Sequence, residues 1–514
     1  MGLHRFIIVI PVADRPQHIR ACLASLSELL RCYPCPNPIS VLIADDSADD
    51  VNVATNRDIA QHFSAAGLLT IHFSPDEQAD LVAALSGEMT RIIGNAPRED
   101  FGHKGQGVMR NIAYLKVAEM LKDAPDANTL IWSIDSDQEF CVKIATPEGD
   151  REVYAVDFFR ALDAIFSNTD ALVLTGKVVG DPPVSPAVMT SNFLDDVIGF
   201  LRQVIANDPA CACQHHAAEN RQEGEAAYHD MADLFGFKSA EIYRYHCMLD
   251  GTHTEADCFA HFASRLNSFF YGEHPTRVSY YLHQDALASV QPARTVYAGN
   301  YVFRPAALKY FIPFASLRLR MSGPTLGRLI KSEIGPRFVS ANLPMLHKRT
   351  VESGGQAEFR PGIATTAEII DMSGEFERQF YGDVMLFSIE KLAAKCAFSR
   401  LASADFSAAL DTVRAEMLEK YNTRQQTILG KLQVLEALLH DPAHWWNRAP
   451  EHALAVDNFK HFAANIQRNF GAGSSGHTRI NAAEGWSKWR TELLEAIAHY
   501  PEDRQAWERM LCAG

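Results

Sequence analysis

The sequence predicts an α/β protein with a mostly parallel sheet wrapped by helices. Short continuous apolar runs, which suit strands buried on both faces, alternate with segments whose apolar residues recur at helical spacing. This order predicts parallel strands because parallel neighbours need a crossover connection, usually a helix. Acidic side chains follow two of the apolar runs, at the strand ends where open α/β sheets bind their ligands.

The first strands and helices come in quick succession. The run "FIIVIPV" begins at Phe6 and predicts a strand, and the next segment has Pro16 in the first turn of an expected helix. The run "ISVLIADD", from Ile39, predicts a second strand, and "LLTIHFS" predicts a third. Helices are expected over residues 51–65 and 76–93, after the second and third strands.

Length, composition and charge limit the function classes. The chain has 514 residues, which is ample for more than one domain, and its net charge is −15, from 48 basic and 63 acidic residues. That charge argues against a nucleic-acid binder or an anionic-membrane binder, so local groups must meet any anionic ligand. No apolar run approaches the roughly 18 residues of a membrane span. We therefore expect a cytoplasmic protein with no nucleic-acid partner and no membrane span.

The cysteines predict reduced thiols. Ten cysteines in 514 residues fall short of the density of a disulfide scaffold. Cys32 and Cys35 form a CxxC pair, but the chain has no second CxxC to complete a zinc site. We expect a loop between a helix and a strand there.

Asp45 and Asp46 directly follow the second apolar run, and three interpretations are open. Receiver domains chelate Mg²⁺ with such a pair, but after their first strand, whereas here a complete strand and helix come first. Acids also cap helices, which suits Asp49 and Asp50 better than the first two. The third interpretation is that the pair binds a nucleotide at the carboxyl edge of the sheet.

A loop of three glycines and a lysine leads into the next expected helix, "GHKGQGVMRNIAYLKVAEML", from Gly102. The exposed amides and the positive dipole end at the start of a helix favour an anion. The loop is not a phosphate-binding P-loop, because no GK[ST] ends it, and no strand runs straight into the glycines as in a dinucleotide fingerprint. Taken alone, it fits a flexible loop equally well.

The most informative stretch is "NTLIWSIDSDQEF", in which an apolar strand ends in Asp135-Ser-Asp137. Side chains alternate along a strand, so residues i and i+2 point the same way and both carboxylates can converge on one hard cation. A solvated pair of acids is the alternative. Its position after two strand–helix units and the glycine-lysine loop favours a DxD motif that binds Mn²⁺ or Mg²⁺.

Together, "FIIVIPVADRP", "VLIADDSADD", "GHKGQGVMRNIA" and "WSIDSDQEF" resemble the nucleotide-sugar half of GT-A glycosyltransferases of the family-2 type, over about residues 4–180. The resemblance implies a Rossmann-like GT-A fold. In that family the acid after the second strand contacts the nucleobase, the loop before the "RN" helix flanks base and ribose, and the DxD holds ribose and metal. The nucleotide-sugar contacts implied here are Pro11, Asp14, Asp45, Asp46, Lys104, Arg110, Asn111 and Asp135.

A second block, "YAGNYVFRPAALKYFIPF" followed by "LPMLHKRT", resembles the sugar-side segment of the same family. Several GT-A enzymes use a His after this strand as a third metal ligand, so the resemblance implies a Mn²⁺ or Mg²⁺ site made by Asp135, Asp137 and His347, with Asp137 catalytic. A packed or surface histidine is the alternative. Lys348 and Arg349 would neutralise the diphosphate, or form an ordinary solvated pair.

The chain departs from the family at the general base. Many inverting members carry a Glu-Asp pair where this sequence has Gly323, Pro324 and Thr325. Glu333 lies about two helical turns later, on the wrong side of the expected helix. Retaining members need no such base, because the leaving phosphate oxygen can take the acceptor proton. The departure therefore leans weakly towards retention.

Residues 207–291 are interpreted as a helical insertion near the acceptor side. Cys211, Cys213, His215 and His216 have zinc-ligand chemistry, but four partners from one short segment crowd too closely for a tetrahedral site. The acidic and tyrosine side chains later in the insertion fit a polar helix face better than a polyol site; they are Tyr228, Asp230 and Asp233.

The expected domain organisation has two parts. A catalytic domain covers 1–380, with its nucleotide-binding half at about 1–180 and an acceptor and metal segment at about 292–352. Helical spacing continues through 381–514, which predicts an all-helical C-terminal domain. Packing against the catalytic domain, homodimer formation and acceptor binding are the roles expected for it.

The sequence thus predicts a metal-dependent glycosyltransferase that moves a sugar from a nucleotide diphosphate sugar, UDP favoured, to an acceptor hydroxyl on a small molecule or glycan. Two alternatives stay open. A sugar-phosphate nucleotidyltransferase shares the sheet and metal, but its glycine-rich loop belongs directly after the first strand, where "PVADRP" stands. An inactive GT-A domain serving as a binding or scaffold module is the other.

Overall fold

The structure is a computed structural model that describes residues 4–85, 87–94, 101–122, 128–146, 149–216, 245–312, 314–349, 360–366, 369–393 and 403–513. Tyr228, Asp230 and Asp233 of the predicted insertion lie outside these ranges. Within them, no helix combines the length and the apolar character that a membrane crossing requires.

One mixed sheet forms the centre of the fold. Its strands are β1 (Arg5–Val12), β2 (Ile39–Asp45), β3 (Thr70–Phe73), β4 (Thr129–Ile134), β5 (Gln138–Glu139), β8 (Val173–Gly180), β9 (Gln291–Pro292), β10 (Asn300–Phe303) and β11 (Phe338–His347). They lie in the order β3-β2-β1-β4-β10-β8-β11-β5, and β9 pairs with β11. The α/β class is therefore confirmed.

Only part of the sheet is parallel. The four strands β3, β2, β1 and β4 run parallel, as do β8 and β11. β10 is antiparallel to both β4 and β8, and β5 and β9 are antiparallel to β11. The carboxyl ends of β1, β2 and β4 therefore meet at one edge, as the sequence predicts, whereas the other half of the sheet is mixed.

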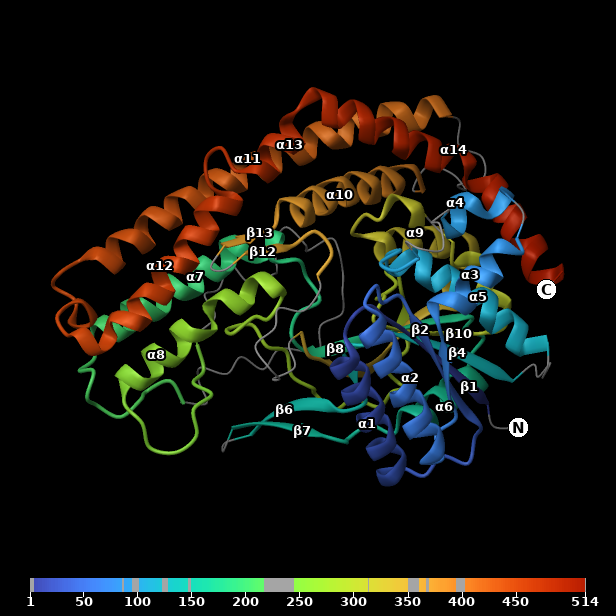
Figure 1. Cartoon of the computed structure of the whole chain (residues 1–514), viewed down its shortest axis with the longest axis horizontal. Helices are drawn as coiled ribbons and strands as arrows, with labels where there is room; N and C mark the ends of the chain where they lie inside the picture. Colours follow the sequence, from blue (N-terminus) through green and yellow to red (C-terminus); the bar gives the residue numbers. More distant parts are fainter. Residues whose placement is uncertain are drawn as a thin grey trace.

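Helices flank the sheet on both faces (Figure 1). The helices that precede β11, the last strand of the sheet along the chain, are α1 (Pro16–Cys32), α2 (Asp50–Ala65), α3 (Pro75–Ala83), α4 (Thr90–Ile93), α5 (Gln106–Lys122), α6 (Phe158–Asn168), α7 (Pro186–Ile205), α8 (Glu255–Arg265) and α9 (Ser322–Ile334). The helix expected over 76–93 is broken into α3 and α4 with a short 3₁₀ turn that begins at Gly87. Glycine is a poor helix former, which favours a break there. Two hairpins lie outside the sheet: β6 (Val142–Thr146) with β7 (Gly149–Val153), and β12 (Ala364–Thr366) with β13 (Ile369–Asp371).

The alternation of side chains along β1 divides the core in two. Phe6 and Ile8 point into an apolar cluster shared with α1 and α6, whereas Ile7 and Val9 point into a second cluster shared with α5. All four side chains are fully buried. A continuous apolar run in this strand is thus explained by helices on both faces.

The C-terminal helices continue the second cluster. They are α10 (Ser373–Ala393), α11 (Ser403–His440), α12 (Ala453–Phe470), α13 (Ser475–Asn481) and α14 (Ala483–Ala513). Figure 1 shows α10 between α9 and the long outer helices α11 and α14. Phe380 and Tyr381, which flank the expected domain boundary, are fully buried within α10 and belong to the same apolar cluster as Ile7 and Trp507. The indole of Trp507 also donates a hydrogen bond to the carbonyl of Leu308. These helices are therefore joined to the sheet by one continuous core, and a homodimer through them stays a prediction.

Candidate functional site

A cleft of about 600 Å³ opens at the carboxyl ends of β1 and β4. Five of the predicted site residues line it: Pro11, Asp46, Asp135, Asp137 and His347. They come from the end of β1, the loop after β2, the loop after β4 and the end of β11. The remaining predicted contacts do not line the cleft; they are Asp14, Asp45, Lys104, Arg110 and Asn111.

Asp137 and His347 lie side by side at one wall of this cleft. Nε2 of His347 is 3.6 Å from Oδ2 of Asp137, and both side chains are almost fully buried. Nδ1 of His347 lies 2.7 Å from the backbone oxygen of Asp181. Because a carbonyl oxygen only accepts, Nδ1 carries a proton, and Nε2 is the ring nitrogen that faces Asp137.

Three arginines surround the same carboxylate. Oδ2 of Asp137 lies 3.4 Å from Arg349, 3.8 Å from Arg15 and 4.0 Å from Arg360. Burial alone would raise the pKa of Asp137, but His347 and the arginines outweigh it and hold the pKa well below its ordinary value. The other oxygen, Oδ1, is buried without a hydrogen-bond partner among the described residues. Asp137 is therefore a carboxylate with one oxygen left for a ligand.

Asp135 is held differently, although it precedes Asp137 by only two residues. Its Oδ1 accepts from the guanidinium of Arg110 and from the side-chain amide of Gln106, both on α5. Arg110 also donates to the backbone oxygen of Ala298. Burial raises the pKa of Asp135, while Arg110 opposes that effect. Arg110 of the "RN" helix thus fixes the first acid of the DxD motif.

Only two of the three predicted metal ligands, Asp137 and His347, lie beside each other. Among the described groups of ligand atoms that lie within 4.8 Å of one another, none contains Asp135, Asp137 and His347 together. Of the three, only Asp137 and His347 lie close enough together to share a divalent cation: Asp137 has an unpartnered buried oxygen, and Nε2 of His347 faces its carboxylate. Asp135 would have to leave Arg110 to join them.

The two acids of the second strand have separate roles. Asp45 is fully buried and accepts from the amide of Ser47, from Asn56 and from the ring of His72 at 2.8 Å. Its contacts are thus to the neighbouring strand β3 and helix α2. Asp45 braces the sheet edge, and only Asp46 reaches the cleft.

Asp46 holds the glycine-lysine loop. Its carboxylate accepts from the amides of Lys104 and Gly105 at 3.0 and 3.1 Å and lies 2.8 Å from Nζ of Lys104. Burial lowers the pKa of Lys104, which Asp46 counteracts. Gly105 has a φ of +94°, a conformation that favours glycine, so the loop can turn its amides towards Asp46. The loop and the acid form one unit beside the cleft.

The other predicted contacts support neighbouring loops. Asp14 accepts from the amides of Ala48 and Asp49 and from the ring of His103, which ties the loop after β1 to those after β2 and before α5. Asn111 donates to the backbone oxygen of Ile92. Both side chains are therefore committed to protein groups, and neither lines the cleft.

Several residues that line the cleft belong to no recognisable sequence motif. Its arginines are Arg15, Arg318, Arg320, Arg349, Arg360 and Arg378, and its acids are Asp46, Asp135, Asp137 and Glu375. Of the arginines, the sequence singles out only Arg349, because it follows His347. The others come from separate segments, and only a shared positive charge relates them. Glu333, by contrast, pairs with Arg504 of α14 at 3.3 Å and lies outside the cleft.

No protein-family model matches the chain, and no curated protein is significantly similar to it in sequence.

Proposed function

We propose that this protein is a metal-dependent glycosyltransferase of the GT-A type, which transfers a sugar from a nucleotide diphosphate sugar to an acceptor hydroxyl. The observation that carries the proposal is the pair of Asp137 and His347 among arginines, in a cleft at the carboxyl ends of parallel strands. The volume of about 600 Å³ lies within the range of small-molecule sites.

The charge of the cleft suits a diphosphate. The whole chain has a net charge of −15, yet six arginines face four acids in the cleft. Arginine forks match phosphate oxygens in geometry, so Arg349 and Arg360 beside Asp137 are the proposed diphosphate partners. A local excess of positive charge in an acidic protein supports an anionic ligand at this place.

Asp137 and His347 would hold the cation, Mn²⁺ or Mg²⁺. When bound, a divalent cation would supply Lewis-acid stabilisation of the charge that develops on the leaving diphosphate. Mn²⁺ tolerates an imidazole ligand better than Mg²⁺, which favours Mn²⁺ here. Asp135 would orient Arg110 and the start of α5 towards the ligand.

The other acids of the cleft support retention of configuration. Glu375 accepts from Ser185 and lies 3.2 Å from Arg320 and 3.4 Å from Arg378. Asp46 is committed to Lys104 and its loop. Because each acid is already held by a protein cation, none is placed as a general base. A retaining transfer needs no such base.

Isothermal titration of UDP and GDP, each with and without Mn²⁺, tests the proposal. We expect binding that depends on the cation, and a thermal shift that grows with nucleotide concentration. Absence of metal-dependent nucleotide binding would favour a scaffold module. Release of pyrophosphate from a nucleoside triphosphate and a sugar phosphate would instead identify a nucleotidyltransferase.

A further inference from the structure

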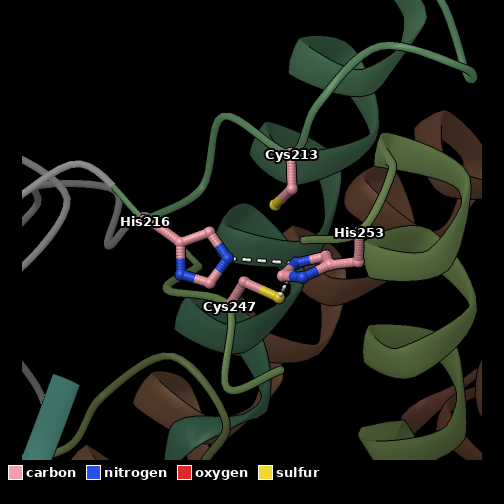
Figure 2. A group of neighbouring side chains, drawn as sticks. All are labelled: Cys213, His216, Cys247 and His253. Atoms are coloured by element: carbon pink, nitrogen blue, oxygen red, sulfur yellow. Dashed lines mark hydrogen bonds between the residues drawn. The ribbon is translucent and has the colours of Figure 1, made fainter. Parts of the chain in front are cut away.

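A second cluster with metal-ligand chemistry lies in the predicted insertion, and none of its four residues lines the cleft. Figure 2 shows the sulfur atoms of Cys213 and Cys247 and the facing rings of His216 and His253 directed into one space. One ligand atom from each of the four residues lies within 4.8 Å of the others. Both cysteines are free thiols in the structure.

The distances approach those of a tetrahedral site. The Nε2 atoms of His216 and His253 are 3.0 Å apart, and Sγ of Cys247 is 3.3 Å from Nε2 of His253. Around a zinc ion with Zn–N of about 2.0 Å and Zn–S of about 2.3 Å, the corresponding separations are roughly 3.3 and 3.5 Å. Both observed separations are close to these values.

The tautomer of His253 makes its Nε2 a ligand atom. Nδ1 of this ring lies 3.0 Å from the backbone oxygen of Gly251, so Nδ1 carries the proton. His216 and Cys247 therefore both face a single lone pair, which accepts a hydrogen bond from only one of them. A cation among the four atoms would satisfy all of them at once. Donation of the second ring nitrogen to a backbone carbonyl is also the usual support of a metal-bound histidine.

Backbone hydrogen bonds hold the two halves of the cluster together. The amide of Cys213 donates to the oxygen of His253, and the amide of Cys247 donates to the oxygen of His215, each at 3.1 Å. The amide of His215 points at Sγ of Cys213 at 3.4 Å, where it would stabilise a thiolate. The ligand geometry therefore rests on main-chain contacts between two segments.

Other groups of this kind are already occupied by protein partners. Glu255, near Cys213 and Cys258, accepts from Asn207 and from the amide of Gln214 and lies 3.1 Å from the ring of His215. Lys348 fills the acidic group near Cys141, because it lies 2.7 Å from Glu152 and 3.4 Å from Glu139. Among the contacts that the structure describes, no such cation lies beside the side chains of Cys213, His216, Cys247 and His253.

We propose that Cys213, His216, Cys247 and His253 bind one structural Zn²⁺. Two thiolates and two imidazoles fill all four tetrahedral positions, so the site has no open position for a substrate. The ion would fasten the segment after α7 to the segment that enters α8. Because α8 packs on α12, with Phe259 stacked on Phe459, the site would also secure this end of the helical layer.

This set corrects part of the sequence interpretation. The sequence places Cys211, Cys213, His215 and His216 in one crowded segment, from which no tetrahedral site can form. In the structure, only Cys213 and His216 of that segment belong to the cluster, and its other two members, Cys247 and His253, come from a segment more than 30 residues later. The spacing C-x₂-H and C-x₅-H, split by a long intervening segment, gives no recognisable motif.

Metal analysis of the tag-free full-length protein, purified from zinc-containing medium, tests the proposal. We expect about one zinc per chain, retained through gel filtration, as in closed structural sites. Cys213→Ser and Cys247→Ser should each lower the content more than about tenfold, because a missing thiolate opens the site. Cys211→Ser is the matched control for Cys213→Ser, since both cysteines are half-buried but Cys211 lies outside the group, and it should keep its zinc.

Cobalt substitution of the unaltered protein keeps the test independent of variant folding. We expect visible bands of tetrahedral Co²⁺ together with near-ultraviolet thiolate charge transfer. The proposal is overturned if the unaltered protein holds no zinc and gives no such bands, or if intact-mass analysis shows a Cys213–Cys247 disulfide. Equal zinc loss in Cys211→Ser and Cys213→Ser would also overturn it. Asp137→Asn should keep its zinc, which separates this site from the proposed catalytic cation.

Discussion

Nε2 of His347, at the end of β11, lies 3.6 Å from Oδ2 of Asp137, in the loop after β4, although the two residues are far apart in the chain. The pairing of β11 with β5 creates this contact, because His347 lies directly opposite Gln138, the residue after Asp137. Strand register thus brings the second acid of the DxD motif to the histidine, and three arginines surround the acid.

Replacing Asp137 should remove cation-dependent nucleotide binding. Asp137→Asn keeps the shape but loses the anionic ligand and the neighbour of three guanidinium groups, so we expect loss of turnover and at least about tenfold weaker UDP binding with Mn²⁺. Because the folded pKa is depressed, Asp137 is ionised at neutral pH, and its stabilising effect disappears only as the pH falls below about 4. Isothermal titration and thermal unfolding measure both effects.

The matched control is Glu139→Gln, two residues further along. Glu139 pairs with Lys348 at 3.4 Å and does not line the cleft, so this variant should bind Mn²⁺ and UDP as the parent does. Parent-like binding by Asp137→Asn would remove Asp137 from the site.

His347→Ala should weaken the cation more mildly. Water can replace one imidazole ligand, so we expect Mn²⁺ affinity in the presence of UDP to fall about tenfold, which corresponds to about 1.4 kcal/mol. His103→Ala is the control, because His103 also lines the cleft but contacts Asp14. Titration of Mn²⁺ in the presence of UDP measures this. If His347→Ala and His103→Ala bound Mn²⁺ with equal affinity, His347 would be a structural residue only.

The sequence predicts the first half of the fold well because its signals are local. Apolar runs such as that from Phe6 must lie between two layers of helices, and the structure places its residues in clusters on both faces. Of the later strands, β5, β9 and β10 are short, and no repeated strand–helix pattern sets their direction, so the antiparallel β10 could not be predicted. Parallel pairing in the first half then places Asp46 and Asp137 at one edge.

The candidate site could be predicted only where its residues follow one another in sequence. The DxD motif and the "RN" helix are visible as patterns, but nothing local shows that Arg110 binds Asp135 or that Asp45 faces β3. Arg360 comes from a segment with no recognisable motif, as do Cys247 and His253, which meet Cys213 and His216 in the second cluster. These residues are related by tertiary contacts alone, which a single sequence does not show.

A buried acid in the helical layer should make stability depend on pH. Burial raises the pKa of Asp383 on α10 to about 7, although Tyr421 and Gln379 both donate to it. Arg424 and Arg320 also act against the shift. The folded state therefore holds a proton on Asp383 that the unfolded chain, with an ordinary pKa near 4, would release.

Because the folded pKa is raised, the stabilisation is fully present below about pH 4 and is lost as the pH rises through about 7. Asp383→Asn imitates the protonated acid, so it should unfold at a higher temperature than the parent at pH 8, with a difference of at most about 4 kcal/mol that shrinks towards pH 5. Thermal unfolding at both pH values measures this. Asp457→Asn, on the exposed face of α12, should show no such trend, and a constant difference for Asp383→Asn would contradict the assignment.

Asp46 would act in the proposed nucleotide site in one of two ways: by contacting the nucleobase or by anchoring the glycine-lysine loop. One oxygen accepts from the amide of Lys104 and lies 2.8 Å from its Nζ, and the other accepts from the amide of Gly105. Both oxygens are thus committed to the loop. The side chains of Asp46 and Lys104 are only 5% and 3% exposed, so a charge left alone there is costly.

Asp46→Asn presents an amide group where a second acceptor is needed and leaves the Lys104 ammonium without its partner, so we expect a loss of about 3 kcal/mol in unfolding free energy. Lys104→Met in the same chain should restore part of that stability, because it removes the unpaired charge. If Asp46 acts through the loop, UDP affinity should rise and fall with melting temperature across Asp46→Asn, Lys104→Met and the double variant, since the loop residues His103 and Gly105 line the cleft. Titration of UDP alongside thermal unfolding compares the two quantities. Weakened UDP binding in Asp46→Asn at an unchanged melting temperature would show instead that the carboxylate contacts the base directly.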